Sequence, residues 1–509
     1  MDFEFYREKL NEEPGIEPGK PKTWSAIKSK LVAYRREWLE DVKEKSDSKN
    51  YPKNLSELAV ANGINKYLHV ITLENGKVAI YDPDQGYYIK DYKFAYKLVH
   101  ILQPTFNETK CRNVLFMLAS MDRKYGAMDF EPEYQDVRRY VLVKNGIYDK
   151  KKRELLPFDH RFINFSTIET KLIPNAPLPQ IGKWNVEDWL LDLMSGDKEL
   201  IQLLWQVVSA SLNGNYSYRK SIWFVGNGND GKGTFQQMIS NLVGFKNVAP
   251  LKLNQFAERF GLAIIEGKTV IIGDDVQAGI YVDESSNFNS VVTGEPVSIE
   301  KKGENPYMAV FKKTVIQSTN AMPVFKNKSN GTYRRIIIIP FKKTFSANDD
   351  NWAIKDDYIN RPEVLEYVLW KAINLDFERF DEPKATIDRM KEFKEDNNTI
   401  FKFLNEYLED VESTRIPVPF LWVIYQQWCK LNNVTAPKKS NFDKEIESCL
   451  PHNWESKRGK TLSNFKPSVD KPEYFINGTY NWDEKEAQKT KRIIKKLRSY
   501  DKLRFIVTS

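Results

Sequence analysis

Glycines and one lysine near the middle of the chain are spaced for phosphate binding. The apolar residues 222–225 end at Gly226, and after a gap of four residues come Gly231 and Lys232. Glycines let backbone N–H groups turn towards phosphate oxygens, a following helix adds its dipole, and the lysine brings a positive charge to the terminal phosphates. Glycine-rich turns also close ordinary strand–helix units, so the loop alone leaves both interpretations open. The predicted phosphate-binding residues are Gly226, Asn227, Gly228, Asn229, Asp230, Gly231, Lys232, Gly233 and Thr234.

The residue after Lys232 departs from the usual pattern of a phosphate-binding loop. A serine or threonine normally follows the lysine and ligates Mg²⁺. Here Gly233 stands in that place, and the nearest hydroxyl belongs to Thr234. Thr234 is therefore the candidate for the hydroxyl ligand of Mg²⁺.

Two aspartates follow a strand that is predicted to be buried on both faces. Residues 268–276 contain four consecutive apolar or β-branched residues, then a glycine, then Asp274 and Asp275. A site that hydrolyses a nucleotide needs one acid to hold Mg²⁺ through water and a second to orient or deprotonate the attacking water. In isolation, two aspartates capping a strand end would be the simpler explanation. Together with the loop they predict ATP and Mg²⁺ as cofactors, with Thr234 and Asp274 as metal ligands.

A polar residue and two basic residues accompany the next two predicted strands. Asn320 ends the stretch 312–320, where its amide can position the hydrolytic water against the terminal phosphate. Arg334 and Arg335 directly precede the apolar residues 336–339. Charges beside such a run have little structural justification, whereas an arginine that reaches the nucleotide of a neighbouring subunit stabilises transition-state charge. This interpretation implies a ring of subunits.

A hairpin is predicted over residues 297–313, between the two acids and the polar strand end. Lys301 and Lys302 lie beside its turn, and Lys312 and Lys313 lie near the end of the return strand. In a ring, lysines on hairpin tips would face a central strand of nucleic acid. Lysines also keep exposed hairpins soluble, so this interpretation depends on the neighbouring motifs.

The C-terminal part is predicted to bind DNA through a winged-helix module. Short helices are expected at residues 399–411, 418–431 and 442–450, the last capped by Ser440 or Asn441. A basic turn after the third helix is expected to form a β wing, which completes the outline of a module that places a helix in the major groove. A plain helical lid is the alternative. The predicted DNA-binding residues of hairpin and module are Lys301, Lys302, Lys438, Lys439, Lys444, Lys457, Arg458 and Lys460.

The order of these elements predicts an α/β protein of several domains. Apolar strands alternate with helical stretches through the middle of the chain, and a proline-rich linker at residues 172–184 separates two α/β blocks. The predicted segments are a loosely attached N-terminal helical segment (1–66), a small α/β domain (67–180), the block with the phosphate loop (181–382), the winged-helix-like domain (383–475) and a basic C-terminal tail (476–509).

Composition limits the class of protein further. A chain of 509 residues is too long for one core, so two to four domains are expected. A net charge of +8 permits a nucleic-acid partner but equally fits a well solvated surface. Three widely spaced cysteines are too few for a disulfide framework or a zinc site, which predicts a reducing, cytoplasmic setting. The charged N-terminus and the lack of a long apolar run predict neither export nor membrane insertion.

The order of the motifs resembles superfamily 3 helicases of the AAA+ class, specifically the poxvirus-and-phage primase-helicase type. Residues 145–213 are similar to the domain that precedes the ATPase in that family, and the chain also resembles the Rep initiator-helicases of staphylococcal pathogenicity islands. The resemblance implies an AAA+-like ATPase core in residues 181–382, between an N-terminal α/β domain and a C-terminal winged-helix-like domain. Many relatives carry an N-terminal primase domain, for which the residues before Tyr67 are too few.

The same resemblance implies a role for each motif. Lys232 and Thr234 would contact phosphate and Mg²⁺, Asp274 and Asp275 would be the hydrolytic acids, Asn320 the sensor of the γ phosphate, Arg334 or Arg335 the arginine finger, and Lys302 the pore residue.

The resulting hypothesis is a homohexameric, ATP-driven DNA helicase that loads itself at a replication origin of a mobile element. Its expected partners are single-stranded DNA in the ring pore and double-stranded origin DNA at the C-terminal domain. Three alternatives remain open on the sequence: another ring-forming ATPase such as a packaging motor or protein remodeller, a sequence-specific DNA-binding protein with a weak ATPase, and an RNA-directed helicase.

Overall fold

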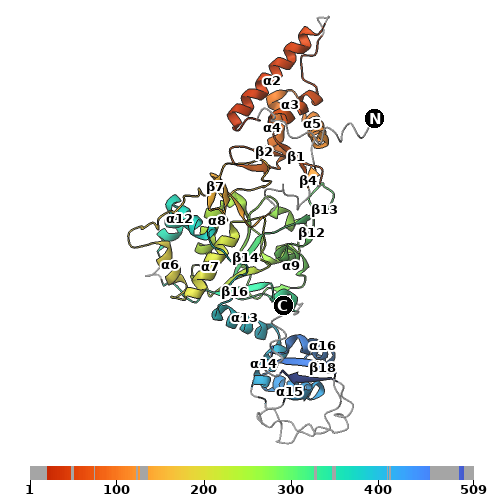
Figure 1. Cartoon of the computed structure of the whole chain (residues 1–509). Coiled ribbons are helices and arrows are strands. Elements are labelled where there is room, and N and C mark those ends of the chain that lie inside the picture. Colours follow the sequence, from red (N-terminus) through yellow and green to blue (C-terminus); the bar gives the residue numbers. More distant parts are fainter. Residues whose placement is uncertain are drawn as a thin grey trace. The chain divides into compact units, whose positions relative to one another are not determined.

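Figure 1 shows the computed structural model of the chain. The structure describes residues 20–46, 51–73, 75–121, 124–125, 136–325, 330–346, 351–409, 411, 414–458 and 492–497. Two compact units divide the chain. The first comprises Met1–Ala278, Ser285–Ala321 and Ile339–Pro383, and the second comprises Gly279–Glu284, Met322–Ile338 and Lys384–Ser509. In the described ranges, no helix combines the length and the apolar character needed to cross a membrane.

The first unit begins with helices that pack on a four-stranded sheet of order β3-β2-β1-β4 (Figure 1). Ile27 and Leu31 of its first long helix share one apolar core with Val60, Val70 and Leu98. The segment expected to be loosely attached is therefore packed into this domain, because the apolar face of its helix covers neighbouring elements. The elements are α2 (Trp24–Glu44), α3 (Glu57–Tyr67), β1 (Val70–Leu73), β2 (Val78–Asp82), β3 (Tyr87–Ile89), α4 (Tyr92–Leu102), α5 (Glu108–Met121) and β4 (Lys124–Tyr125).

Polar side chains begin the helices of this domain. Thr23, Ser56 and Asp91 precede α2, α3 and α4, and each accepts a hydrogen bond from an N–H group in the first turn of its helix. Such a cap contributes about 1 kcal/mol to helix stability. These caps explain why the helices start where they do.

A three-stranded antiparallel sheet of order β5-β6-β7 follows and contacts the central block. The hydroxyl of Tyr148 donates to Asn374 Oδ1 at 2.7 Å, and the hydroxyls of Ser166 and Thr269 are 2.8 Å apart. The predicted small α/β domain and the block with the phosphate loop accordingly belong to the same compact unit. The strands are β5 (Tyr140–Val143), β6 (Gly146–Asp149) and β7 (Glu154–Leu156).

A five-stranded sheet of order β16-β8-β14-β10-β9 forms the core of the central block. β8, β14, β10 and β9 run parallel to their neighbours, and every residue of β8 and β14 is buried. Continuous apolar runs are typical of parallel strands covered on both faces, and the parallel sheet confirms the predicted α/β class. The strands are β8 (Ser221–Val225), β9 (Val248–Ala249), β10 (Val270–Val276), β14 (Thr314–Thr319) and β16 (Ile336–Pro340), the last of which crosses from the second unit into the first after Ile338.

Helices α7, α8 and α12 pack against one another beside this sheet. Asp197 starts α7 by accepting hydrogen bonds from the N–H groups of Glu199 and Leu200. The other elements of the block include an antiparallel hairpin, β12–β13, which confirms the hairpin expected over residues 297–313. The elements are α6 (Val186–Leu193), α7 (Lys198–Ser211), α8 (Lys232–Val243), η2 (Phe245–Asn247), η3 (Leu253–Phe256), η4 (Gly261–Ile265), α9 (Ser286–Thr293), β12 (Pro296–Ile299), β13 (Tyr307–Val310), α11 (Trp352–Asp356), η5 (Tyr358–Asn360) and α12 (Pro362–Ile373).

The second unit contains helices and a three-stranded antiparallel sheet of order β17-β19-β18. Leu404, Tyr425, Phe442 and Ile494 lie in its apolar core. The three helices predicted from the sequence are present as α14, α15 and α16, and α13 is an additional helix. The elements are β11 (Tyr281–Val282), β15 (Val324–Phe325), α10 (Asn330–Tyr333), α13 (Lys384–Asn397), α14 (Thr399–Glu409), β17 (Arg415–Pro417), α15 (Val418–Leu431), α16 (Lys439–Cys449), β18 (Trp454–Arg458) and β19 (Arg492–Lys496).

Two expectations for this unit are wrong. Residues 492–496 were expected in a basic tail, but they form β19, the middle strand of the sheet, because Ile493 and Ile494 are buried. The third helix begins at Lys439, so neither Ser440 nor Asn441 caps it. Of the basic turn predicted for the wing, Lys457 and Arg458 belong to β18, whereas Gly459 and Lys460 lie outside the described residues, as do residues 476–491 and 498–509 of the predicted tail.

Candidate nucleotide-hydrolysis site

The predicted phosphate loop joins the end of β8 to the start of α8. Gly228 and Gly231 have φ values of 94° and 82°, a left-handed conformation that glycine adopts without strain. Gly231 is the N-cap of α8 and provides no side chain to cap the first turn. The strand, glycine turn and helix predicted from the spacing are therefore present in that order.

Lys232 lies between this loop and the end of β14. Its ammonium group donates to the carbonyl of Gly226 at 3.1 Å and to Asn320 Oδ1 at 3.5 Å, and it forms an ion pair with Asp230. Lys232 and Asp230 are only 7% and 3% exposed, so the two charges are buried together. Because β8 and β14 are neighbours, the structure brings together Lys232 and Asn320, which are distant in the sequence.

Asp274 and Asp275 lie at the corresponding end of β10, on the other side of β14. Ser318 of β14 donates its hydroxyl hydrogen to Asp274 Oδ1 at 2.7 Å, and Ser318 Oγ accepts from the backbone N–H of Asp275 at 2.9 Å. The pairing of β10 with β14 is irregular between Gly273 and Val276, and Asp275 has a φ of 50°. This local irregularity leaves both carboxylates exposed at the strand end, as a site open to a ligand requires.

The residue types around the loop fit a nucleotide-bound Mg²⁺. Mg²⁺ keeps several waters and takes only one or two protein ligands beside substrate phosphates. Thr234 is half-buried in the first turn of α8, and Asp274 is exposed. The described residues contain no group of three or more His, Cys, Asp or Glu side chains that could hold a metal on its own. The hydroxyl of Thr234 and the carboxylate of Asp274 are of the types that bind Mg²⁺ beside phosphate oxygens, and their role as ligands stays a prediction.

The two predicted arginines, Arg334 and Arg335, belong to the second unit. Both follow α10 directly. Arg334 is exposed, whereas Arg335 is half-buried and its Nη1 donates to the carbonyl of Gly331. The hydrogen bond holds Arg335 to its own turn of helix and leaves Arg334 as the more accessible of the two guanidinium groups.

The β12–β13 hairpin presents its two tip lysines differently. The Lys301 ammonium pairs with Glu266 and lies 5.7 Å from the ring centroid of Tyr307. The Tyr307 hydroxyl donates to the same carboxylate. Lys302, one residue further into the turn, is exposed. Lys301 is thus held at the base of the turn, and Lys302 is the lysine presented to solvent.

Two further ion pairs connect the hairpin to other parts of the first unit. Lys77 Nζ lies 2.5 Å from Glu304, and Arg259 Nε lies 2.8 Å from Glu300. Exposed pairs of this kind contribute about 0–1 kcal/mol each, so they orient the hairpin without locking it.

Lys313 begins the return to β14, with its ammonium against the carbonyl of Gly214. Burial of the charged group, assisted by nearby Lys90, lowers the pKa of Lys313 from 10.5 to about 7. Between these two pH values the unfolded chain binds more protons than the folded chain, so the free energy of unfolding should rise with pH across this window. Lys313→Met should reduce that rise.

Urea unfolding from neutral to alkaline pH measures this effect. Lys302→Met is the matched control, because it removes an exposed hairpin lysine and keeps the buried Lys313. An identical dependence of the free energy of unfolding on pH in wild type and Lys313→Met would contradict the lowered pKa of Lys313.

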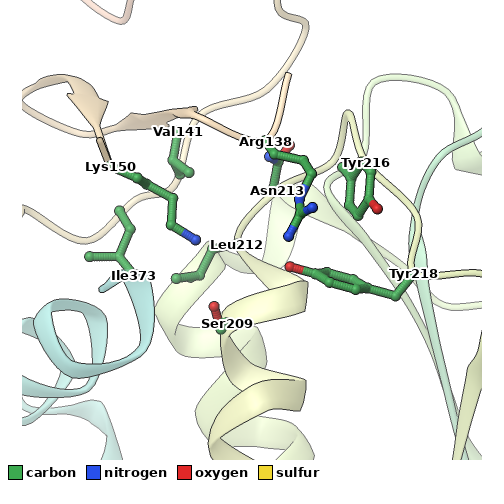
Figure 2. Close-up of a pocket in the computed structure, with 9 residues that line it drawn as sticks. All are labelled: Arg138, Val141, Lys150, Ser209, Leu212, Asn213, Tyr216, Tyr218 and Ile373. Carbon is green, nitrogen blue, oxygen red and sulfur yellow. The ribbon is translucent and has the colours of Figure 1, made fainter. Parts of the chain in front are cut away.

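Figure 2 shows a small cavity elsewhere in the first unit, into which the polar side chains of Arg138, Lys150 and Tyr218 project. Its volume of about 10 Å³ is sufficient for roughly one water molecule. Arg138 Nη2 donates to the carbonyl of Phe377 at 2.8 Å, and Lys150 Nζ donates to the carbonyl of Leu375 at 3.2 Å. Burial raises the pKa of Tyr218 to about 12. Both cations bind carbonyls that follow α12. These hydrogen bonds connect residues 138–150 to the segment after α12 beside the cavity.

The described DNA-binding candidates of the second unit lie around α16 and at the end of β18. Each is exposed, as a contact with a phosphate backbone requires. Lys457 also pairs with Glu455 at 2.6 Å. These residues are Lys438, Lys439, Lys444, Lys457 and Arg458.

Two residues of the site, Ser318 and Glu266, were missed by the sequence analysis, and Asp230 was predicted only as a member of the phosphate loop. Ser318 connects β14 to both acids, and its position two residues before Asn320 at a strand end was a usable signal. Glu266 binds Lys301 and Tyr307 from a segment distant in the sequence, so no local pattern predicts these contacts. The side chain of Asp230 points into the phosphate loop only because the loop is folded, so its orientation has no signal in the sequence.

Two stretches of the chain match known protein families. Residues 224–335, which contain the loop, the acids, Asn320 and the arginine pair, match a family of unknown function (DUF5906). Residues 395–481 match the poxvirus D5 protein-like family. No curated protein matches the chain.

Solved structures of the C-terminal region of NrS-1 are similar to this chain. The A-form apo structure is 13% identical with a TM-score of 0.46, and the match covers 80% of this chain and 88% of that chain. Another apo structure of the same region is 13% identical with a TM-score of 0.45, and covers 82% of this chain and 98% of that chain.

Proposed function

We propose that this protein is an ATP-dependent DNA helicase and replication initiator of a mobile element that works as a homohexameric ring. The observation that carries the proposal is the convergence of Lys232 and Asn320, 3.5 Å apart, beside the two acids at the end of β10. Two observations support a role in replication: residues 395–481 match the poxvirus D5 protein-like family, and the motifs of the central block resemble those of primase-helicases.

Each residue of the site has a proposed role in this reaction. Bound Mg²⁺ would neutralise charge on the terminal phosphates, and Thr234 and Asp274 would hold it. Lys232 would bind the phosphates, and Asp275 would orient or deprotonate the attacking water with Asn320. One of the arginines, Arg334 or Arg335, would reach the nucleotide of a neighbouring subunit and stabilise the charge of the transition state.

DNA would contact two parts of the chain. Lys302 at the hairpin tip would bind the backbone of the single strand in the ring, and its exposure supports this role. The exposed lysines around α16 and the end of β18 would bind the origin duplex, in the manner of a winged helix.

Steady-state ATP hydrolysis tests this proposal, measured with and without single-stranded DNA and beside the molar mass in light scattering. We expect hydrolysis that requires Mg²⁺, stimulation by single-stranded DNA, and a change from smaller species to a hexamer when nucleotide is added. A strict monomer that does not hydrolyse ATP under any of these conditions would contradict it.

A second candidate is an origin-binding protein with a weak ATPase. Two observations favour it: Gly233 replaces the usual metal ligand, and Asp230 occupies the loop. Another ring-forming nucleic-acid motor is distinguished by hydrolysis that DNA stimulates without any separation of strands.

Substitutions at Gly233 and Thr234 test the metal ligand. Thr234→Ala should lower Mg²⁺-dependent hydrolysis by about 10- to 100-fold, the range seen when a metal site loses a supporting group. A Cβ at Gly233 would meet nothing within 4 Å, so a serine fits there. Gly233→Ser should therefore restore hydrolysis to Thr234→Ala.

Gly233→Ala is the matched control, because it adds the same Cβ without a hydroxyl and its helix propensity is at least as high as that of serine. Equal rescue by serine and alanine, measured as hydrolysis against Mg²⁺ concentration, would assign the effect to the helix and not to the metal.

A further inference from the structure

The carboxylate of Asp230 lies inside the predicted phosphate loop. It accepts hydrogen bonds from the backbone N–H groups of Gly228 at 3.2 Å and Lys232 at 3.3 Å, and it pairs with the Lys232 ammonium. We propose that Asp230 is an internal substitute for a phosphate group, which a nucleotide must displace, so that Asp230 sets the affinity of the loop for nucleotide. The inference rests on the proposed nucleotide-binding function.

The donors around Asp230 are those that such a loop offers to a phosphate. Loops of this type bind phosphate oxygens through backbone N–H groups and the ammonium group of their lysine. An ionised carboxylate only accepts hydrogen bonds, as a phosphate oxygen does, and carries the same sign of charge. Asp230 uses two such N–H groups and the ammonium at once, and it is 3% exposed, so it satisfies these donors from within the chain.

The backbone around the Asp230 carboxylate leaves space for it inside the loop. A Cβ on Gly226 would lie 2.2 Å from Asp230 Oδ2 and 2.6 Å from the carbonyl oxygen of Phe341. The N–H of Phe341 donates to the carbonyl of Val225 at 2.8 Å, which keeps this wall of the loop in place. The absence of a side chain at Gly226 therefore provides the space that Asp230 occupies.

Bound nucleotide and Asp230 would compete for the same cation. A carboxylate that stayed beside Lys232 would repel the phosphates, and one that moved away would lose its buried ion pair. Either way, the negative charge of Asp230 opposes nucleotide binding. Replacing it with an uncharged side chain of the same shape should remove this opposition.

Equilibrium titration of the full chain with a fluorescent ADP analogue tests the proposal, in EDTA and in Mg²⁺. Asp230→Asn should bind the analogue at least about tenfold more tightly than wild type under both conditions. Asp192→Asn is the matched control, because Asp192 pairs with Lys343 at the surface and its neighbour Leu193 contacts the loop at Gly231. Asp192→Asn should leave the affinity unchanged.

Thermal unfolding gives a second measurement that does not depend on fluorescence. Asp230→Asn leaves the buried Lys232 without its counter-ion, so the variant should unfold at a lower temperature than wild type without nucleotide. Saturating ADP should then raise the unfolding temperature of the variant more than that of wild type. Asp230→Ser, which also removes the charge, should behave in the same way.

Three results would overturn the proposal. Equal affinity in wild type and Asp230→Asn would show that Asp230 does not compete with nucleotide. Weaker binding of the ADP analogue by Asp230→Asn in Mg²⁺ but not in EDTA would indicate that Asp230 is a metal ligand. Binding by none of the proteins, with Asp192→Asn included, would reject the proposed nucleotide site and this inference with it.

Discussion

Lys232→Ala is expected to reduce ATP hydrolysis by at least about a hundredfold, the cost of removing one group that stabilises charge in a transition state. The Lys232 ammonium lies between the loop carbonyl of Gly226 and the side chain of Asn320. Alanine removes both the charge and its contact with Asn320. Steady-state release of phosphate at saturating ATP and Mg²⁺ measures this loss.

The variant also leaves Asp230 buried without its partner, and an uncompensated buried charge costs about 3–5 kcal/mol of folding stability. Thermal unfolding must therefore accompany the assay. The double variant Lys232→Ala with Asp230→Asn removes both charges, so it should recover stability but not hydrolysis. Recovered hydrolysis in the double variant would show that Lys232 serves only to neutralise Asp230.

Lys302→Ala is expected to spare most ATP hydrolysis and to stop strand displacement. Lys302 lies on the β12–β13 hairpin, on a different part of the unit from the phosphate loop, and it is exposed. Each phosphate contact that is lost weakens binding to DNA and reduces its dependence on salt. Parallel assays of hydrolysis and of unwinding separate the two roles.

Lys301→Ala and Lys183→Ala are controls for this experiment. Lys301 is paired with Glu266, so Lys301→Ala removes an ion pair of the hairpin and not a proposed DNA contact. It should reduce strand displacement less than Lys302→Ala does. Lys183 is an exposed lysine in the linker before α6 and should have no effect. Normal unwinding by Lys302→Ala would show that the hairpin does not carry the strand.

The central sheet could be predicted from the sequence because its strands are continuous apolar runs. Residues 222–225 and 270–272 are buried on both faces, so their pattern indicates parallel strands without reference to the rest of the chain. The ends of neighbouring parallel strands meet at one edge of the sheet. The proximity of Lys232 and Asn320 follows from that rule and from the pairing of β8 with β14.

Other features depend on contacts between distant segments. β19 contains only two buried isoleucines among basic residues, and its partner β18 precedes it by more than thirty residues, so its pairing has no local signature. The attachment of α2 depends on apolar side chains of α3 and the first sheet. The inward position of Asp230 requires the space at Gly226, which exists only in the folded loop.

The early start of α16 has a different physical origin. Serine and asparagine favour N-cap positions, and both Ser440 and Asn441 were candidates for this reason. The helix instead begins at Lys439, and the buried Phe442 and Ile446 set the face that packs into the core of the second unit. Tertiary packing therefore outweighs the local capping preference here.

Unwinding of a forked DNA duplex by the full-length protein, with ATP and Mg²⁺, tests the central claim most directly. The assay should include Lys232→Ala as the variant without hydrolysis and Lys302→Ala as the variant without coupling. We predict that wild type separates the strands only when ATP and Mg²⁺ are both present, and that neither variant does so. ATP hydrolysis stimulated by single-stranded DNA, with no separation of the forked duplex by wild type, would contradict the helicase assignment.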